Sequence, residues 1–345
     1  MIRFKKHEEK AVLQSPLKDY QLDYQPIEYR EDPLTGLTSF IRTGRAFWSA
    51  FYKTDETLVE KLAKETQASC FFCPPRVFTF TPKFPDDLIP EGRLRKGEAT
   101  IFPNLYAQKE YSAVTAISQR HYLGLNEFQP ALLSDALKLS AFYLQQVYQK
   151  GKAKYAEIGA NYLYPAGGSI MHPHLQVLAS NGAHYLIKLY MENGKKHYQK
   201  YSKNYWEELV ERERRLGVRY VGRIGNTEWF TPFAPTREVE VNGVVRGKSN
   251  FSEFDDSDWE SLADGLCRVL KYYHDQGLSC FNYAIYSGPI NQKCNFLWAG
   301  VKIIARTSVQ PYPVSDSWYS TNIFLNGFVT ETPENIASAL RAYFT

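Results

Sequence analysis

The hydrophobic positions of this chain follow two periods, and each period predicts a type of element. Between residues 40 and 125, short β-rich runs such as 111–117 are punctuated by proline and glycine, which indicates antiparallel strands. Residues 76–81 have the same character and are also predicted to form a strand. Apolar residues at helical spacing over 130–150 predict an amphipathic helix that packs against this sheet.

A second block of elements repeats this order after a charged, helical stretch at 192–217. Its strand, strand, helix and strand are predicted at 219–224, 228–233, 256–276 and 280–286. Because the same order of elements occurs twice, we predict an internal duplication. The region before 40 is polar and has a turn signal at 32–36 between extended pieces. The predicted organisation is an arm over 1–40, one half over 41–190 and a second half over 191–345.

Composition narrows the class of protein. With 345 residues, 44% hydrophobic and 23% charged, the chain has the profile of a globular protein with room for two halves. A net charge of +4 without a long block of like charges gives no reason to expect a nucleic-acid partner. No targeting segment and no run of about 18 apolar residues is present, so we expect a cytoplasmic protein without a membrane partner.

The run His172-Pro173-His174-Leu175-Gln176 is the strongest candidate for catalytic chemistry. In an extended chain His172, His174 and Gln176 point to one face. A neutral imidazole can attack phosphorus, and an amide can hold a phosphate oxygen but cannot act as an acid or a base. These residue types favour phosphoryl or nucleotidyl transfer over simple hydrolysis. The alternative is a half-buried strand whose polar side chains only bond to one another.

Cys70-Phe71-Phe72-Cys73 is a candidate metal site, because this spacing lets two thiolates reach one zinc ion. A redox pair and two buried thiols are the alternatives. The five cysteines of the chain are an odd number, which argues against a framework of disulfides. His121 and His172 are the candidates to complete the ligand set, and two thiolates with two imidazoles favour zinc.

Taken together, several segments resemble the galactose-1-phosphate uridylyltransferase family, the transferase branch of the histidine-triad superfamily. The resemblance covers residues 25–180 well and the remainder loosely. It also extends to ADP-glucose phosphorylase and dinucleoside tetraphosphate phosphorylases. The matching segments are Asp32-Pro33-Leu34-Thr35-Gly36, Cys70-x-x-Cys73, Phe102-Pro103-Asn104-Leu105, Glu110-Tyr111-Ser112, His121, Asn161, Gly167-Gly168-Ser169 and His172-Pro173-His174-x-Gln176.

The resemblance implies an α+β fold, with a mainly antiparallel sheet built from two histidine-triad-like halves and helices packed on it. It implies a ping-pong nucleotidyl transfer from a nucleoside diphosphate sugar to a sugar 1-phosphate, and a homodimer. The catalytic residues would be His174, which forms a nucleotidyl-histidine, with Gln176 and Ser169. The implied substrate-binding residues are Asn161, Gly167, Gly168, Arg45, Phe80 and Lys83. The implied ligands of a structural zinc are Cys70, Cys73, His121 and His172.

The chain also departs from the family pattern. Phe80-Thr81-Pro82-Lys83 stands where the uridylyltransferases have an Asn-Asp pair near the nucleoside, so the base can differ. The ligands of a second family metal site fall on Tyr190, Ser287, Gly300 and Lys302, which cannot reproduce that site. Two further functions therefore stay open. One is a phosphorylase that uses inorganic phosphate, and the other is a nucleotide-binding protein without turnover.

Overall fold

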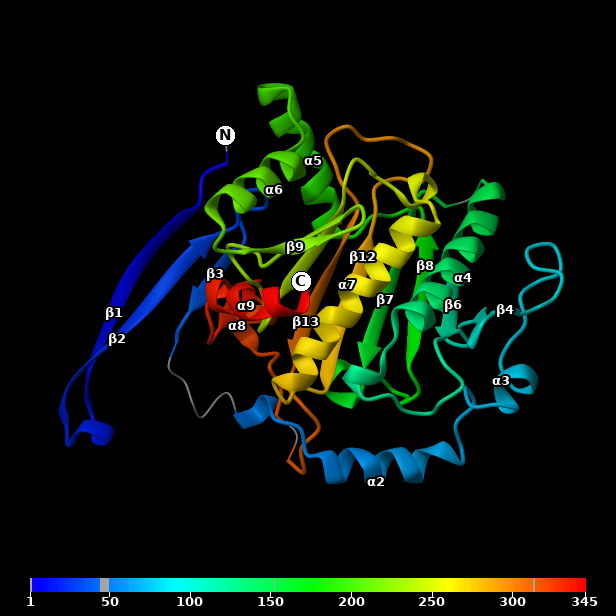
Figure 1. Cartoon of the computed structure of the whole chain (residues 1–345), viewed down its shortest axis with the longest axis horizontal. Helices are drawn as coiled ribbons and strands as arrows, with labels where there is room; N and C mark the ends of the chain where they lie inside the picture. The colour runs from blue at the N-terminus through cyan, green and yellow to red at the C-terminus, as the bar shows by residue number, and fades with distance from the viewer. Residues whose placement is uncertain (1, 44–49, 152, 313) are drawn as a thin grey trace.

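The computed structural model describes residues 2–43, 50–151, 153–312 and 314–345, and its main feature is a large antiparallel sheet. The strand order is β4-β5-β6-β8-β7-β12-β13-β11-β10-β9 (Figure 1). Helices pack on this sheet, which confirms the α+β class. The strands are β4 (Leu94–Lys96), β5 (Ala99–Pro103), β6 (Tyr111–Ala116), β7 (Tyr155–Tyr162), β8 (His174–Ser180), β9 (Tyr220–Ile224), β10 (Thr227–Phe230), β11 (Val241–Val245), β12 (Cys280–Tyr286) and β13 (Gly300–Arg306).

The connectivity of the sheet is the same when it is read inward from either edge. β4-β5-β6-β8-β7 and β9-β10-β11-β13-β12 each begin with three consecutive strands and end with the next two in reversed order. A long helix follows the third strand in each case, α4 (Pro130–Gln149) or α7 (Asp256–Asp275). β7 and β12 pair with each other at the centre, so one continuous sheet carries both repeats. The division of the chain at residue 190 remains a prediction.

The two faces of the large sheet have different roles. Leu175 and Val177 of β8 belong to the main hydrophobic core, together with the buried sides of α4 and α7. His174 and Gln176 alternate with them along the strand and therefore point to the opposite face. Figure 1 shows α4 and α7 side by side across one face. The helices cover this face, and the polar residues of β8 lie on the other.

Most of the predicted elements are present. The strand predicted over 111–117 is β6, those at 219–224, 228–233 and 280–286 are β9, β10 and β12, and both long helices lie where expected. The charged stretch forms two helices, because Ser202 adopts a left-handed backbone with φ 52° and Asn204 caps the next helix. Among the helices of the described residues, none is long and apolar enough to span a bilayer. The remaining helices of four or more residues, apart from α3, are α2 (Glu56–Gln67), α5 (Tyr185–Tyr201), α6 (Tyr205–Leu216), α8 (Tyr319–Asn322) and α9 (Pro333–Leu340).

The strand predicted over 76–81 is wrong, because Arg76–Thr79 form a short helix, α3. The backbone N–H of Val77 donates to the carbonyl of Cys73 at 3.2 Å, and that of Phe80 donates to Arg76 at 2.8 Å. The turn that brings the two cysteines together therefore continues directly into a helical turn. This tertiary constraint outweighs the β propensity of the valine, threonine and phenylalanine residues.

The N-terminal arm is a long β-hairpin that extends away from the large sheet (Figure 1). β1 (Lys5–Ser15) and β2 (Gln21–Glu31) pair along their whole length. The predicted turn at 32–36 follows β2, and there Asp32 Oδ1 accepts from the N–H of Thr35 at 2.7 Å. β3 (Thr38–Ile41) and β14 (Gly327–Val329) complete this second sheet, so the arm is attached to the C-terminal part of the chain.

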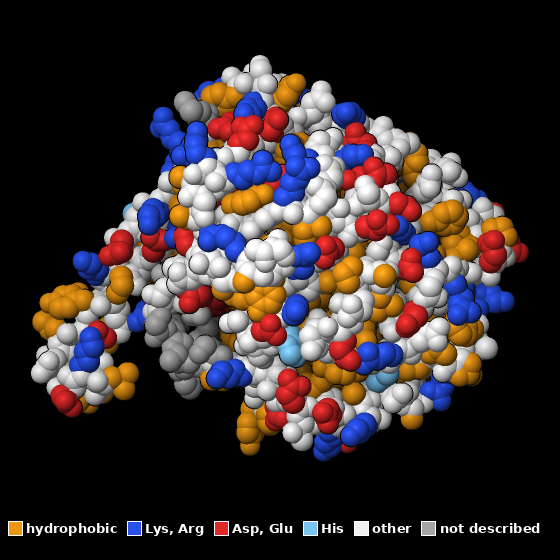
Figure 2. All heavy atoms as spheres, in the orientation of Figure 1, with side chains coloured by type: hydrophobic (Ala, Val, Ile, Leu, Met, Phe, Trp, Pro, Cys, Tyr) orange, Lys and Arg blue, Asp and Glu red, His pale blue; other side chains and the backbone are white. Residues whose placement is uncertain are grey.

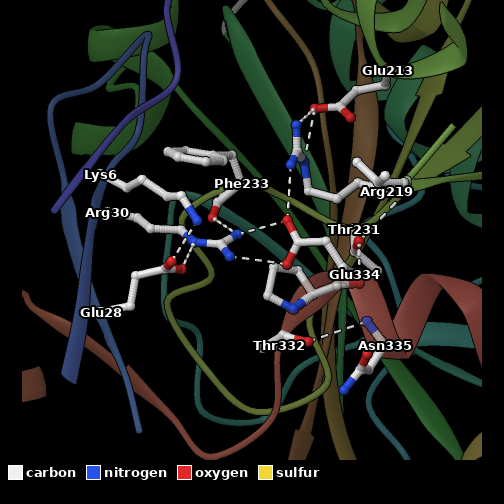
Figure 3. A network of polar contacts seen from close by, with 12 residues as sticks. Lys6, Glu28, Arg30, Glu213, Arg219, Thr231, Phe233, Thr332, Glu334 and Asn335 are labelled. Atoms are coloured by element: carbon white, nitrogen blue, oxygen red, sulfur yellow. Dashed lines mark hydrogen bonds and ion pairs between the residues drawn. The ribbon is translucent and has the colours of Figure 1, made fainter. Parts of the chain in front are cut away.

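Buried ion pairs fix the base of the hairpin (Figure 3). Arg30 of β2 is buried and donates two hydrogen bonds to Glu334 of α9, at 2.9 and 3.0 Å. Arg30 also donates to the carbonyl of Phe233 at 3.0 Å. Arg219 donates to the same Glu334 at 2.8 Å and to buried Glu213 at 3.0 Å. The network connects the arm, the C-terminal helix and the edge of the large sheet.

Replacement of Arg30 by methionine should lower the free energy of unfolding by about 3 kcal/mol, because it removes a buried charge from the network and leaves Glu334 with Arg219 alone and Glu28 with Lys6 alone. Chemical denaturation followed by circular dichroism measures this change. Lys5→Met is the matched control, since Lys5 pairs with Glu31 in an exposed position of the same hairpin. This substitution should lower the free energy of unfolding by less than about 1 kcal/mol. Equal losses in the two variants would contradict this account of the network.

Candidate active site and metal site

His174 is the first residue of β8 and pairs with Ala116 of β6. Its Nδ1 lies 2.8 Å from the backbone carbonyl of His172. Because a carbonyl oxygen only accepts hydrogen bonds, Nδ1 carries the proton and the lone pair is on Nε2. The residue is 8% exposed, and burial lowers the pKa of the imidazole, which keeps it neutral near pH 7. β8 thus presents a neutral histidine in the tautomer that has a nucleophilic Nε2.

Gln176 lies two residues further along β8 on the same face. Its Oε1 accepts a hydrogen bond from Asn104 Nδ2 at 3.2 Å. The orientation of the Asn104 amide is set in turn by Tyr106, whose N–H donates to Asn104 Oδ1 at 3.1 Å. The oxygen of Gln176 is therefore engaged, and its amide nitrogen is the group that can donate to a ligand.

Asn161 is on the same face of the sheet as Gln176 and His174. The pairing of β7 with β8 ends at Gly159 and Gln176, and Asn161 and His174 are each two residues beyond that pair, toward the same end of the sheet. On its other side Asn161 pairs with Asn282 of β12, whose Nδ2 donates to Asn161 Oδ1 at 2.6 Å. Asn161 therefore presents its amide nitrogen as the available donor, as Gln176 does.

The glycine segment between β7 and β8 is a tight loop. Gly167 ends the 3-10 turn Tyr164–Ala166 with φ 84°, a backbone conformation that glycine adopts without strain. A Cβ on Gly168 would lie 2.7 Å from the carbonyl oxygen of Asn161, so this position has no room for a side chain. The exposed Ser169 follows directly. The loop folds closely over the end of β7 and leaves the serine at the surface.

Cys70, Cys73, His121 and His172 place one potential ligand atom each within 4.8 Å of one another. Cys73 Sγ lies 3.4 Å from Nδ1 of both histidines, and Cys70 Sγ lies 3.8 Å from His172 Nδ1. Sulfur and nitrogen ligands of a tetrahedral zinc ion, at about 2.3 and about 2.0 Å from the metal, are separated by about 3.6 Å. The four side chains therefore fit a tetrahedral metal ion.

Both imidazoles of this cluster are oriented by hydrogen bonds on the side away from the sulfurs. His172 Nε2 lies 2.7 Å from the carbonyl of Ser118, and His121 Nε2 lies 2.9 Å from Thr66 Oγ1. Such outer hydrogen bonds are typical of metal-binding histidines. Burial lowers the pKa of His172 to about 4, so the ring is neutral and its Nδ1 lone pair faces the cluster. The hydrogen bonds of the two histidines and the distances within the cluster therefore both suit a bound metal ion.

Phe72 connects the metal cluster to the candidate nucleophile. It stands between the two cysteines in the sequence, and its ring makes edge contacts with His172 and His174 at centroid distances of 6.0 and 5.3 Å. The ring also packs against Phe102 of β5 at 5.1 Å. A cluster that fixes the loop of residues 70–73 therefore also fixes an apolar wall beside His174.

Comparison with known proteins identifies relatives of this chain and its fold. No protein-family model matches the chain. A protein of Archaeoglobus fulgidus, described as uncharacterized, is 31% identical over 317 residues, which are 91% of this chain and 92% of that protein. A solved GalT-like protein of Arabidopsis thaliana is 18% identical with a TM-score of 0.69, over 91% of this chain and 98% of that chain.

An ADP-glucose phosphorylase of Arabidopsis thaliana, solved with bound ADP-glucose, is 19% identical with a TM-score of 0.69 and the same coverage. A uridylyltransferase structure is 19% identical with a TM-score of 0.66, over 92% of this chain and 98% of that chain. This chain belongs to the family of the archaeal protein and has the uridylyltransferase-like fold. The resemblance found in the sequence is thereby confirmed for the fold.

Some predicted substrate-binding residues lie outside this arrangement. Phe80 follows α3, is 69% exposed and has a ring contact with Phe71 at 6.5 Å. Lys83 is exposed, and its aliphatic chain lies against Gly92. Arg45 falls outside the residues that the structure describes. The substrate-binding roles of these three residues stay predictions.

The second repeat of the uridylyltransferase-like fold has different chemistry at the corresponding positions. Lys302 of β13 lies 2.7 Å from Glu240, whose carboxylate is buried. Tyr190 and Tyr286 pack against each other nearby, with ring centroids 5.5 Å apart. The ammonium group of Lys302 is neutralised within the chain, which gives little support for a role of this lysine in binding an anionic acceptor.

Several residues of the site were not found by sequence reasoning. Asn104 belongs to the Phe-Pro-Asn-Leu segment that resembles the family, but nothing in the segment indicated its bond to Gln176. Thr66 and the carbonyl of Ser118 orient the metal-cluster histidines without any local signal. Asn282 is 121 residues from its partner Asn161 and is brought beside it only by the pairing of β7 with β12.

Proposed function

We propose that this protein is a nucleotidyltransferase that acts on a nucleoside diphosphate sugar through a nucleotidyl-His174 intermediate. The observation that carries the proposal is the state of His174, a neutral ring with Nδ1–H bonded to a carbonyl and the Nε2 lone pair available. Two amide donors, on Gln176 and Asn161, are on the same face of the sheet as His174. Such donors suit the non-bridging oxygens of a phosphate.

The proposed reaction has two displacements at one phosphorus atom. Nε2 of His174 forms a bond to the α-phosphorus, and the bond from that phosphorus to the bridging oxygen breaks, so that a sugar 1-phosphate leaves. An oxygen of the acceptor phosphate then attacks, the N–P bond breaks and the neutral imidazole is restored. Nδ1–H donates to the carbonyl of His172 throughout and stabilises the charge that the substituted ring carries. Ser169, Gly167 and Gly168 are proposed to contact the same phosphate.

The metal in this proposal is zinc, held by Cys70, Cys73, His121 and His172. When bound, it supplies structural cross-linking and takes no part in bond making or breaking. His172 is two residues before His174, the first residue of β8. A metal ion that holds His172 in place therefore also fixes the start of β8.

The acceptor separates two candidate activities. A sugar 1-phosphate would make the protein a hexose-1-phosphate uridylyltransferase-like enzyme, and inorganic phosphate would make it a phosphorylase. The phosphorylase stays the second candidate, since the chain has the same fold as the ADP-glucose phosphorylase structure and as the uridylyltransferase, with TM-scores of 0.69 and 0.66. Chromatography of the products formed from a bound nucleotidyl group with each acceptor distinguishes the two.

Intact-protein mass spectrometry tests the covalent step. The protein is incubated briefly with UDP-glucose, UDP-galactose, ADP-glucose, GDP-mannose or diadenosine tetraphosphate. One acid-labile nucleoside monophosphate per chain is expected with one of these donors, and its mass identifies the base. A nucleotide-binding protein without turnover would bind one of these compounds and form no adduct.

We further propose that residues 41–190 carry the chemistry and that residues 191–345 shape the site. The residues of the covalent step lie on β7, β8 and the loop between them. The corresponding strands of the second repeat, β12 and β13, have Asn282 and Lys302 on this face and no histidine.

A homodimer is the proposed assembly, formed through the N-terminal hairpin. Figure 2 shows apolar side chains gathered on the projecting hairpin, away from the body. Leu17 is 94% exposed, and five further large apolar side chains of the hairpin are exposed as well. Apolar groups in this number at the end of an arm suit burial against a second copy. The further five are Val12, Leu13, Tyr20, Leu22 and Tyr24.

Size-exclusion chromatography with light scattering should give twice the mass of one chain for the wild type. The triple variant Leu17→Ser, Tyr20→Ser and Leu22→Ser should give the mass of one chain at the same concentration, because it removes apolar area from the contact. Replacement of Leu216 by serine is the control, since it removes an exposed leucine of α6 from the body and should leave the mass unchanged. A wild type with the mass of one chain would contradict the proposed dimer.

A further inference from the structure

A chain of hydrogen bonds runs from the second repeat into the candidate active site. Asp316 accepts two hydrogen bonds from Arg306, at 2.7 and 2.5 Å. Arg306 Nη1 donates to Asn282 Oδ1 at 2.7 Å. Asn282 Nδ2 then donates to Asn161 Oδ1 at 2.6 Å and to the carbonyl of Ala166 at 2.8 Å. Asn282 and Arg306 belong to β12 and β13, whereas Asn161 belongs to β7.

Arg306 fixes the direction of every hydrogen bond in this series. A guanidinium group has five N–H donors and no acceptor, so the atom of Asn282 that faces it must be the amide oxygen. The amide nitrogen of Asn282 then faces Asn161 and can only donate to its oxygen. Asn161 is left with its own amide nitrogen for a ligand. The orientations of two amides, which are ambiguous in isolation, follow from one arginine.

Asp316 keeps Arg306 in place. The paired hydrogen bonds to the carboxylate hold the guanidinium plane in one orientation. The side chains of both residues are largely buried, Asp316 the more so. If Arg306 were displaced, the Asn282 amide could rotate with little loss of hydrogen-bond energy.

The same amide also reaches the glycine loop. Its second hydrogen bond goes to Ala166, directly before Gly167 and Gly168. Asn282 therefore contacts the two features of the first repeat that are proposed to bind phosphate, the Asn161 side chain and the loop.

We propose that Asn282, Arg306 and Asp316 are positioning residues that fix Asn161 as a hydrogen-bond donor, so that the site presents an N–H group to a phosphate oxygen. This inference rests on the proposed function and gives the second repeat a specific part in it. The selectivity is for a hydrogen-bond acceptor: a donor nitrogen attracts a phosphate oxygen, and an amide oxygen in the same place repels it.

Asn282→Asp tests the direction of the hydrogen bonds. The new carboxylate still accepts from Arg306, but it cannot donate, so Asn161 must rotate to present its nitrogen to the carboxylate and its oxygen to the ligand. Binding is measured by calorimetry with AMP, UMP and GMP, and with the corresponding nucleosides. The variant should bind the monophosphate that the wild type prefers about 10- to 100-fold more weakly. Binding of the nucleoside should change less than about twofold, because it has no phosphate.

Two further variants separate positioning from general damage. Asn335→Asp makes the same chemical change at an exposed site on α9 and should leave both affinities unchanged. In an Asn161→Ala background, Asn282→Asp should weaken monophosphate binding by less than about threefold more, because only the hydrogen bond to the Ala166 carbonyl is then left to lose. Thermal unfolding of every variant is recorded alongside.

The outcomes distinguish this inference from the proposed function. Weakened monophosphate binding together with an adduct on wild-type His174 supports both. The same weakening in a protein that forms no adduct supports the positioning residues and overturns the proposed transferase activity. Unchanged monophosphate binding in Asn282→Asp, or equal loss for nucleoside and monophosphate, overturns the positioning residues. A wild type that binds none of the three monophosphates overturns both.

Discussion

Replacement of His174 by alanine is expected to abolish the nucleotidyl adduct and to lower turnover by at least about 10⁴-fold. The substitution removes the atom that would bond to phosphorus, and no other imidazole can replace it. His172, the nearest histidine in the chain, is completely buried, and its two nitrogens face the thiol cluster and the Ser118 carbonyl. Adduct formation is followed by intact mass, and turnover by product chromatography.

The His174→Ala substitution should affect the reaction and leave the fold and the metal site intact. His174→Ala keeps the four residues of the metal cluster, so its metal content and unfolding midpoint should stay close to those of the wild type. His274→Ala is the matched control, because His274 is at the exposed end of α7 and belongs to the opposite, helix-covered side of the sheet. A His174→Ala protein that retains the adduct or the turnover would disprove the proposed mechanism.

Replacement of Cys73 by alanine is expected to remove the metal ion and to lower the free energy of unfolding by about 4 kcal/mol. Cys73 Sγ is 3.4 Å from the ring nitrogen of each histidine, so its loss opens the centre of the cluster. Elemental analysis should find about one zinc per chain in the wild type and almost none in the variant. A chelator should lower the unfolding midpoint of the wild type and leave that of the variant unchanged.

Cys267→Ala is the control for the loss of a buried sulfur. Cys267 is part of the α7 core, where removal of the thiol should cost about 1 kcal/mol and leave the zinc content unchanged. A Cys73→Ala protein with full zinc content would contradict the ligand set. A stable variant without zinc would instead show that the ion contributes little to folding.

The sequence predicted the parts of the molecule that are governed by local pattern. The helical spacing over 130–150 predicted α4. The alternation in residues 172–176 predicted that His172, His174 and Gln176 share a face; His174 and Gln176 do so on β8, but His172 precedes the strand and belongs to the metal cluster. The Cys-x-x-Cys spacing with two distant histidines predicted a cluster that the structure brings together. These features follow from residue spacing, which can be read directly from the amino-acid sequence.

What could not be predicted depends on tertiary contact. Residues 76–81 have strand-forming side chains, but the turn at Cys73 imposes α3. The bond from Asn282 to Asn161 requires β7 and β12 to be neighbours, and Asn282, unlike Asn161, was not marked by the family resemblance. The tautomer of His174 depends on the distance to a backbone carbonyl, which no residue pattern encodes.

The pairing of β7 with β12 also determines what would happen if the chain were divided between its repeats. Each fragment would expose a central strand with a full row of unpaired backbone N–H and C=O groups, which is a template for aggregation. The first fragment would also lose the amide that holds Asn161. The second repeat has no histidine on β12 or β13, but its strand edge keeps the central strand of the first repeat paired.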